Sequence, residues 1–131
     1  MIGLVLVAHA GIARELQEAA RIIMGEIECV EAVGIKPDDP VDLIRDAITE
    51  AIKKVGDDGV IIMTDMFGGT PSNMSLSFLQ ENRVEVLTGV NLPMMIKFVA
   101  DRGKFGVAEL ADKLKQCGRE SIIVAGEYLK K

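Results

Sequence analysis

The sequence predicts an α/β fold, with a doubly wound and mostly parallel sheet that carries helices on both faces. Short apolar runs alternate with helical patterns along the chain, which is typical of parallel strands joined by crossover helices. The runs at residues 2–8 and 60–64 are almost continuously apolar, which indicates strands buried on both faces. No long polar linker interrupts the series, so we expect residues 1–131 to form a single domain.

The expected strands are short runs of apolar, often β-branched residues bounded by turn-forming or charged positions. We place them at residues 2–8, 27–33, 60–64, 84–88 and 121–125. In the flavodoxin-like strand order 2-1-3-4, the first and third strands lie side by side at the centre of the sheet.

The first two helices follow from apolar periodicity and from end signals. Within residues 12–23, apolar residues recur at spacings of three and four, and Gly25 is suited to end this helix. Asp39 and Pro40 have the residue types of an N-cap and a first helical position. A second helix is therefore expected from this point to the residue before Gly56.

The remaining helices are predicted by the same signals. Thr70 and Pro71 are the expected N-cap and first position of a third helix. Asn91 is expected to cap a fourth helix. An amphipathic pattern at residues 107–114 predicts a last helix that Gly118 closes.

The composition argues against several kinds of partner and location. Fifteen basic and twenty acidic residues give a net charge of −5, which repels both nucleic acids and anionic membranes. The apolar stretch at residues 2–8 is far too short to span a bilayer, so no membrane insertion is expected. Cys29 and Cys117 lack the C-x-x-C spacing, and we predict that they are buried free thiols in the reducing cytoplasm.

Two candidate catalytic side chains follow the two central strands. His9, the only histidine, comes after the first strand, and Asp65 comes after the third. Ligands of such sheets bind beyond the carboxyl ends of the strands, where the strand order reverses. Alone, His9 could simply bond to backbone at a strand end and Asp65 could cap its own turn. Their shared location favours a functional pair.

A paired histidine and carboxylate have a specific chemical use. A carboxylate that accepts the Nδ1 hydrogen fixes the tautomer of the imidazole and leaves Nε2 as a nucleophile. The same carboxylate stabilises the positively charged ring that phosphorylation produces. His9 is therefore the predicted phosphoryl acceptor and Asp65 its partner.

The loop after Asp65 has the composition of an anion-binding site. Gly68 and Gly69 allow a ligand to approach the backbone closely, and Thr70 to Ser72 open the third helix. Unpaired N–H groups at a helix start favour a bound anion. An ordinary strand-to-helix loop would look similar, so the phosphate site at Gly68, Gly69, Thr70 and Ser72 is a hypothesis that depends on His9.

Three segments together make the chain resemble the enzyme IIA domain of the mannose-type sugar phosphotransferase system. They are His9-Ala10-Gly11, the stretch at residues 64–73 with the sequence TDMFGGTPSN, and the stretch at residues 89–94 with the sequence GVNLPM. Their order and spacing match those of the family, and the resemblance covers nearly the whole chain. The aspartate-to-asparagine stretch is the specific part.

The resemblance implies a role for several residues and partners. It implies that His9 carries a phosphoryl group, that Asp65 orients it, and that Thr70 and nearby backbone N–H groups hold the phosphoryl oxygens. A histidine-containing phosphocarrier protein would be the donor and an enzyme IIB component the acceptor. No metal or cofactor is implied, and the chain would form a homodimer that exchanges its last strand. Met66 and Phe67 depart from members with a hydroxyl residue and a tryptophan there.

Other functions compete with this one to different degrees. A receiver-like module phosphorylated on Asp65 would need an acidic cluster after the first strand and a lysine after the last, and the chain has neither. A flavin module would need hydroxyl residues after the first strand. A phosphotransferase subunit related to dihydroxyacetone kinase, or a regulatory phosphoprotein without a sugar permease, stays open because both share the histidine chemistry.

Overall fold

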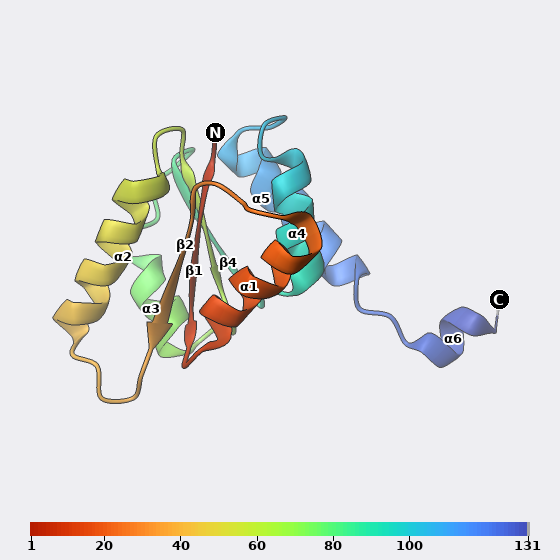
Figure 1. Cartoon of the computed structure of the whole chain (residues 1–131), viewed down its shortest axis with the longest axis horizontal. Coiled ribbons are helices and arrows are strands. Elements are labelled where there is room, and N and C mark those ends of the chain that lie inside the picture. The colour runs from red at the N-terminus through yellow and green to blue at the C-terminus, as the bar shows by residue number, and fades with distance from the viewer. Residues whose placement is uncertain (131) are drawn as a thin grey trace.

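The structure is a computed structural model that describes residues 1–130, and it has four strands and six helices in that range (Figure 1). The strands are β1 (Gly3–His9), β2 (Val30–Ile35), β3 (Val60–Thr64) and β4 (Val84–Thr88). The helices are α1 (Ile12–Met24), α2 (Val41–Val55), α3 (Thr70–Leu76), α4 (Leu92–Asp101), α5 (Val107–Glu120) and α6 (Ala125–Leu129).

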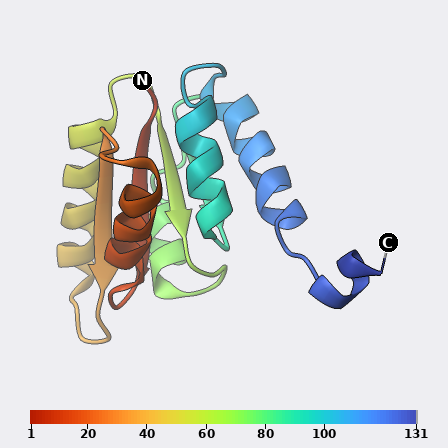
Figure 2. The ribbon, with the colours of Figure 1, turned by 45° about the vertical axis from the view of Figure 1, so that its right-hand side comes forward.

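The four strands form one parallel sheet in the order β2-β1-β3-β4. Helices α2 and α3 cover one face and α1, α4 and α5 cover the other, as Figures 1 and 2 show. The doubly wound fold and the strand order expected from the sequence are confirmed. In this register His9 pairs with Ile35 of β2, and Val7 pairs with Thr64 of β3. The carboxyl ends of the two central strands therefore meet at one edge.

Each face of the sheet has its own apolar core. One core contains Leu4 and Leu6 of β1 with Phe98 of α4 and Leu110 of α5. The other core joins the alternate side chains of β1 and β3 to α2. Every residue from Leu4 to Ala8 is at most 1% exposed, which explains the unbroken apolarity of this strand.

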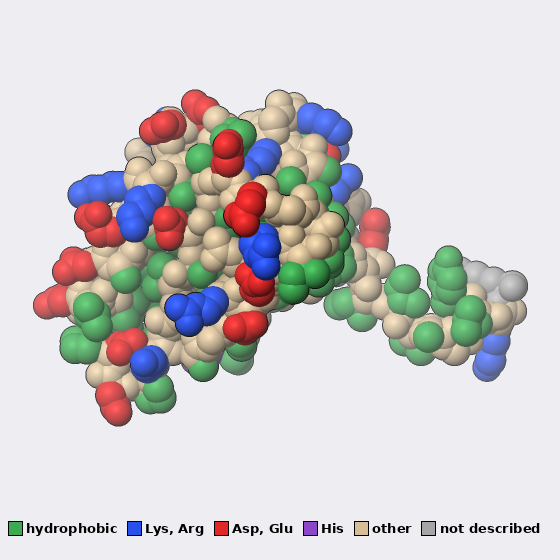
Figure 3. Space-filling model, viewed as in Figure 1, with side chains coloured by type: hydrophobic (Ala, Val, Ile, Leu, Met, Phe, Trp, Pro, Cys, Tyr) green, Lys and Arg blue, Asp and Glu red, His purple; other side chains and the backbone are tan. Residues whose placement is uncertain are grey.

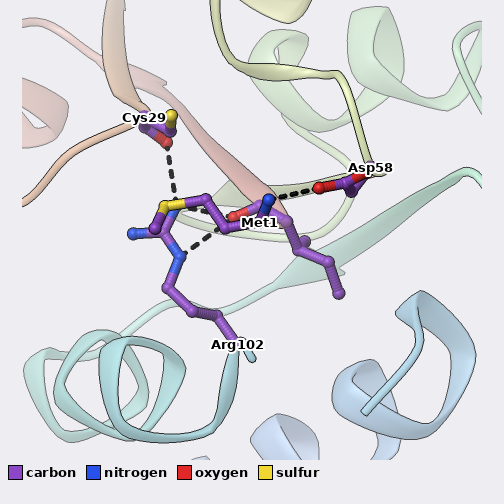
Figure 4. Close-up of polar contacts among 5 residues, drawn as sticks. Met1, Cys29, Asp58 and Arg102 are labelled. Carbon is purple, nitrogen blue, oxygen red and sulfur yellow. Dashed lines mark hydrogen bonds and ion pairs between the residues drawn. The ribbon is translucent and has the colours of Figure 1, made fainter. Parts of the chain in front are cut away.

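The end of α4 is tied to the start of the sheet by a buried arginine (Figure 4). The Arg102 guanidinium donates to the carbonyl oxygens of Ile2 at 2.6 and 3.0 Å, of Glu28 at 2.8 Å and of Cys29 at 3.5 Å. It also lies 4.7 Å from the centre of the Phe98 ring. These hydrogen bonds join the end of α4 to the residue before β1 and to the loop before β2. They lie at the amino ends of the strands, opposite the carboxyl ends that carry His9 and Asp65.

Several predicted element ends differ by a few residues. Strand β2 begins at Val30, because Cys29 adopts a positive φ of 57° that interrupts extended backbone. Pro40 is the N-cap of α2, since the carboxylate of Asp39 instead accepts the backbone N–H of Lys36 at 2.8 Å. Gly69, not Thr70, is the N-cap of α3. The cysteines are free, as predicted, but they are half-buried, so the prediction that they are buried is wrong.

The helix that was predicted to end at Gly118 is α5, and it ends later. Helix α5 continues to Glu120, and Gly118 lies at a packing contact: a Cβ atom there would lie 2.6 Å from the Met94 sulfur of α4. The glycine therefore allows two helices to approach closely rather than ending one of them.

Beyond α5, the chain leaves the body of the molecule as an arm, which we define as residues 122–129 (Figures 1 and 2). The predicted strand at residues 121–125 is wrong for this single chain, since α6 begins at Ala125 and the segment before it pairs with no strand of residues 1–130. The arm is strongly apolar (Figure 3). Five of its side chains are at least 58% exposed: Ile122, Ile123, Val124, Tyr128 and Leu129.

Candidate functional site

His9 is the last residue of β1 and stands where the sheet ends. The next residue, Ala10, has a φ of 49°, which is uncommon for a residue with a side chain. The Ala10 N–H donates to the Ile35 carbonyl at 2.9 Å, and a Cβ at Gly34 would come within 2.6 Å of the Ala10 oxygen. This tight turn directs the chain away immediately after His9, whose side chain stays 44% exposed.

Asp65 follows β3 and lies directly beside His9, as the strand order predicts. Its Oδ2 atom accepts the backbone N–H of His9 at 2.9 Å and lies 2.7 Å from the His9 Nδ1 atom. Its Oδ1 atom accepts the N–H of Met66 at 3.0 Å. The carboxylate is only 13% exposed, so these contacts fix its position.

The electrostatics of this pair favour an ionised Asp65. Burial alone would raise the pKa of the Asp65 carboxyl, but the hydrogen bonds from the backbone and ring of His9, and the charge of that ring, lower the pKa overall. A carboxylate only accepts hydrogen bonds, so the His9 Nδ1 atom must carry the hydrogen. The lone pair of the neutral ring is therefore on Nε2.

The Nε2 side of the ring faces the start of α3. A Cβ atom at Gly69 would lie 2.9 Å from His9 Cε1 and 3.4 Å from His9 Nε2. The first helical hydrogen bond runs from the Asn73 N–H to the Gly69 oxygen at 2.9 Å. Backbone N–H groups before Asn73 have no partner within the helix, and Pro71 has none to offer. Gly68 reaches this loop with a φ of 87°, which glycine adopts without strain.

The predicted phosphate-binding residues do not lie equally close to the histidine. The geometry places Gly69 against the ring, and Thr70 lines a cleft of about 390 Å³ together with His9. Ser72 is fully buried, and its hydroxyl has no hydrogen-bond partner among the described residues. Only the backbone N–H of Ser72 stays a candidate contact for a ligand at the surface.

The same cleft contains residues that the sequence did not reveal. Lys36, Pro37 and Asp39 reach it from the loop between β2 and α2, and Ala10 lines it beside His9. The second strand was predicted to end at residue 33, and with that end the loop was not expected to reach His9. The pairing of Ile35 with His9 is what brings the loop to the site.

Within residues 1–130, no three His, Cys, Asp or Glu side chains come together as a metal site. No helix in the same range has the length and apolarity needed to cross a bilayer.

Gly69→Ala is expected to slow any reaction at His9 on the order of tenfold, because the added methyl group pushes the imidazole away from Asp65. Its φ of −84° is acceptable for alanine, so stability should change little. Phosphorylation rates and thermal melting measure the two effects. Gly11→Ala is the matched control, since a Cβ there meets nothing within 4 Å. Equal phosphorylation rates in both variants would remove Gly69 from the site.

Comparisons with known proteins agree with this geometry. Residues 3–115 match the family described as PTS system fructose IIA component. The fructose-specific EIIA component of Bacillus subtilis is 29% identical over 100% of this chain and 91% of its own length. The sorbose-specific EIIA component of Lacticaseibacillus casei is 29% identical over 89% of this chain and 86% of its own length.

A solved structure shows the same likeness in three dimensions. The phosphotransferase system component EIIA from Streptococcus agalactiae superimposes with a TM-score of 0.88 and 26% identity, covering 97% of this chain and 99% of that one. Since the family match includes both central strands, the loop after β3 and most of α5, it contains the whole neighbourhood of His9. We conclude that the chain belongs to the mannose-type family of phosphotransferase-system IIA components.

Proposed function

We propose that this protein carries a phosphoryl group on His9, within the cytoplasm, from a histidine-containing phosphocarrier protein to an enzyme IIB component of a sugar phosphotransferase system. The observation that supports this most is the contact of 2.7 Å between His9 Nδ1 and Asp65 Oδ2. It leaves Nε2 as the nucleophilic nitrogen in a half-exposed ring. Membership of the family supplies the transferase context.

The transfer balances without a metal or an external base. The Nε2 lone pair of His9 attacks the phosphorus, and the bond between phosphorus and the donor's imidazole nitrogen breaks. The electron pair of that bond returns to the donor ring. His9 keeps its Nδ1 hydrogen throughout, so its phosphorylated ring is positive and the Asp65 carboxylate stabilises it. Transfer to the acceptor is the same step in reverse.

The phosphoryl oxygens would be held at the start of α3. Gly68 and Gly69 leave the backbone accessible, and the N–H groups of Gly69, Thr70 and Ser72 precede the first helical hydrogen bond. The Thr70 hydroxyl is a further donor, because Thr70 is exposed at the cleft that His9 lines. Hydrogen bonds to charged phosphoryl oxygens are stronger than those between neutral groups.

The partner proteins would dock over the loop that follows Asp65. Phe67 is 74% exposed and Met66 56% exposed, and both directly follow the carboxylate that holds His9. Exposed aromatic and methionine side chains are enriched at protein interfaces. This placement would bring a partner's own reactive residue to the histidine.

We also propose a homodimer in which the arms are exchanged. Extended residues before Ala125 carry three exposed apolar side chains, and both outer strands of the sheet have a free edge. Such a segment gains hydrogen bonds and apolar burial by adding to a partner's sheet. A double variant, Ile122→Glu with Ile123→Glu, is expected to sediment as a monomer and the control Glu127→Gln as a dimer. A monomeric unmodified protein would contradict the exchange.

The carrier function is tested by labelling and chase. The protein is incubated with a phosphocarrier protein that bears radioactive phosphate, and the modified residue is mapped by mass spectrometry under alkaline conditions. We expect label on His9, followed by its transfer when an enzyme IIB component is added. Label on His9 that no enzyme IIB component removes would favour a regulatory phosphoprotein or a subunit related to dihydroxyacetone kinase.

A further inference from the structure

Two cationic side chains without carboxylate partners stand near the carboxyl end of β1. Lys36 and Arg14 take part in none of the ion pairs found within residues 1–130. Seven other Lys and Arg side chains in that range have a carboxylate within 4.0 Å: Arg21, Arg45, Lys53, Lys54, Lys97, Lys104 and Lys115. In a chain with a net charge of −5, an unpaired cation beside the candidate nucleophile is available to bind an anion.

The backbone of Lys36 is held firmly beside His9. Ile35, the residue before it, pairs with His9 in the parallel register of β1 and β2. The Lys36 N–H donates to Asp39 Oδ2 at 2.8 Å, and the Asp39 N–H donates to the Lys36 oxygen at 3.2 Å. The Asp39 carboxylate is thereby engaged with backbone, while the lysine side chain remains exposed.

Lys36 and Arg14 differ in the clefts that their side chains line. Lys36 shares the cleft of about 390 Å³ with His9 and Thr70. Arg14 lines a neighbouring cleft of about 580 Å³, which also includes Lys36 but neither His9 nor Thr70. Apart from His9, the titratable side chains that line this cleft among residues 1–130 are Lys36 and Asp39.

We infer that the Lys36 ammonium group contacts the phosphoryl group on His9 Nε2 and offsets its negative charge; this rests on the proposed function. A phosphoryl group there lies close to the Asp65 carboxylate, which has the same sign of charge. The helix start and Thr70 offer donors without a full charge. A lysine is a strong phosphate binder as a point charge and needs no fixed fork geometry. Lys36 thus completes the binding of phosphoryl oxygens from the β2 side.

The test uses a phosphoryl donor that needs no partner protein. Potassium phosphoramidate transfers its phosphoryl group to histidine nitrogen and releases ammonia. With it, Lys36→Met is expected to phosphorylate on the order of tenfold more slowly than the unmodified protein, while Lys36→Arg recovers most of the rate. Arg14→Met is the matched control and should react at a rate close to that of the unmodified protein, because Arg14 does not line the cleft that contains His9 and Thr70.

A second readout separates contact from a structural effect. In the phosphorylated protein, a pH titration followed by phosphorus NMR reports the pKa of the phosphoryl group, which faces Lys36, Asp39 and Asp65. A nearby ammonium group lowers that pKa, so Lys36→Met should raise it and Arg14→Met should not. Lys36 is an exposed loop residue, and melting curves of all variants should coincide.

The outcomes distinguish this inference from the proposed function. Equal rates and an equal phosphoryl pKa in Lys36→Met and the unmodified protein would overturn the contact with Lys36 while leaving His9 as the carrier. If Lys36→Met reacts more slowly with the phosphocarrier protein but at the unmodified rate with phosphoramidate, the contact is also overturned and Lys36 is assigned to partner docking. If the unmodified protein takes no label on His9 from either donor, the proposed function itself fails.

Discussion

His9→Ala is expected to take up no phosphoryl group at all from a labelled phosphocarrier protein. The chain contains no other histidine, so no second imidazole can replace it. The His9 side chain is 44% exposed, and its removal should leave the fold intact. Scintillation counting of the isolated protein gives the result, and melting curves of both proteins provide the control for folding.

The chemistry of the label decides between His9 and Asp65 as acceptor. A phosphoramidate on His9 should be lost in acid and kept in alkali, and it should form in excess chelator. An acyl phosphate on Asp65 would require magnesium to offset charge repulsion during attack by a carboxylate. Full labelling of His9→Ala, or a label that survives acid and disappears in alkali, would overturn both the site and the function.

The sheet and the contact between His9 and Asp65 were predictable because they depend on local patterns and on one topological rule. Strands β3 and β4 were placed at the observed residues, since short runs rich in β-branched apolar residues and bounded by charged or turn residues leave little ambiguity. The order 2-1-3-4 then brings the ends of β1 and β3 together. The contact between His9 and Asp65 follows directly from that neighbourhood.

Features that depend on packing between distant segments were not predictable. Gly118 was expected to end α5, because glycine at a helix end and glycine at a helix contact look the same in a sequence. Likewise, the run at residues 121–125 has the composition of a strand, but a strand also needs a partner. Within residues 1–130 of a single chain none pairs with it.

The missed part of the site has a similar explanation. Lys36 lies at the cleft only because β2 continues to Ile35, two residues beyond its predicted end. Ser72 was predicted to belong to the phosphate site, but its position in the first turn of α3 turns its side chain into the core, so only its backbone N–H remains a candidate contact. Composition pointed to the loop as a candidate site, whereas the direction of each side chain required the backbone.

Asp65→Asn is expected to slow phosphoryl transfer to His9 on the order of 10²-fold or more, by analogy with the loss of an orienting or charge-stabilising group at other sites. An amide has no charge to stabilise the phosphorylated ring. Its NH₂ group also favours the tautomer with the hydrogen on Nε2, which blocks the nucleophile. Stopped-flow or quench measurements of the transfer rate test this, with the exposed Asp57→Asn as matched control. Rates equal to those of the unmodified protein would reduce Asp65 to a turn residue.

The same variant should change how stability depends on acid. Folding lowers the pKa of Asp65 from its ordinary value of 3.8. The ionised carboxylate therefore stabilises the fold at pH values above 3.8, and this stabilisation is lost as the pH falls through the lower pKa of the folded state. Asp65→Asn lacks this contribution at every pH. Its melting temperature should therefore lie below that of the unmodified protein at neutral pH, and the difference should shrink in acid below 3.8. A difference that stayed constant, or that grew on acidification, would mean that the hydrogen bonds from His9 do not hold Asp65 in its ionised form.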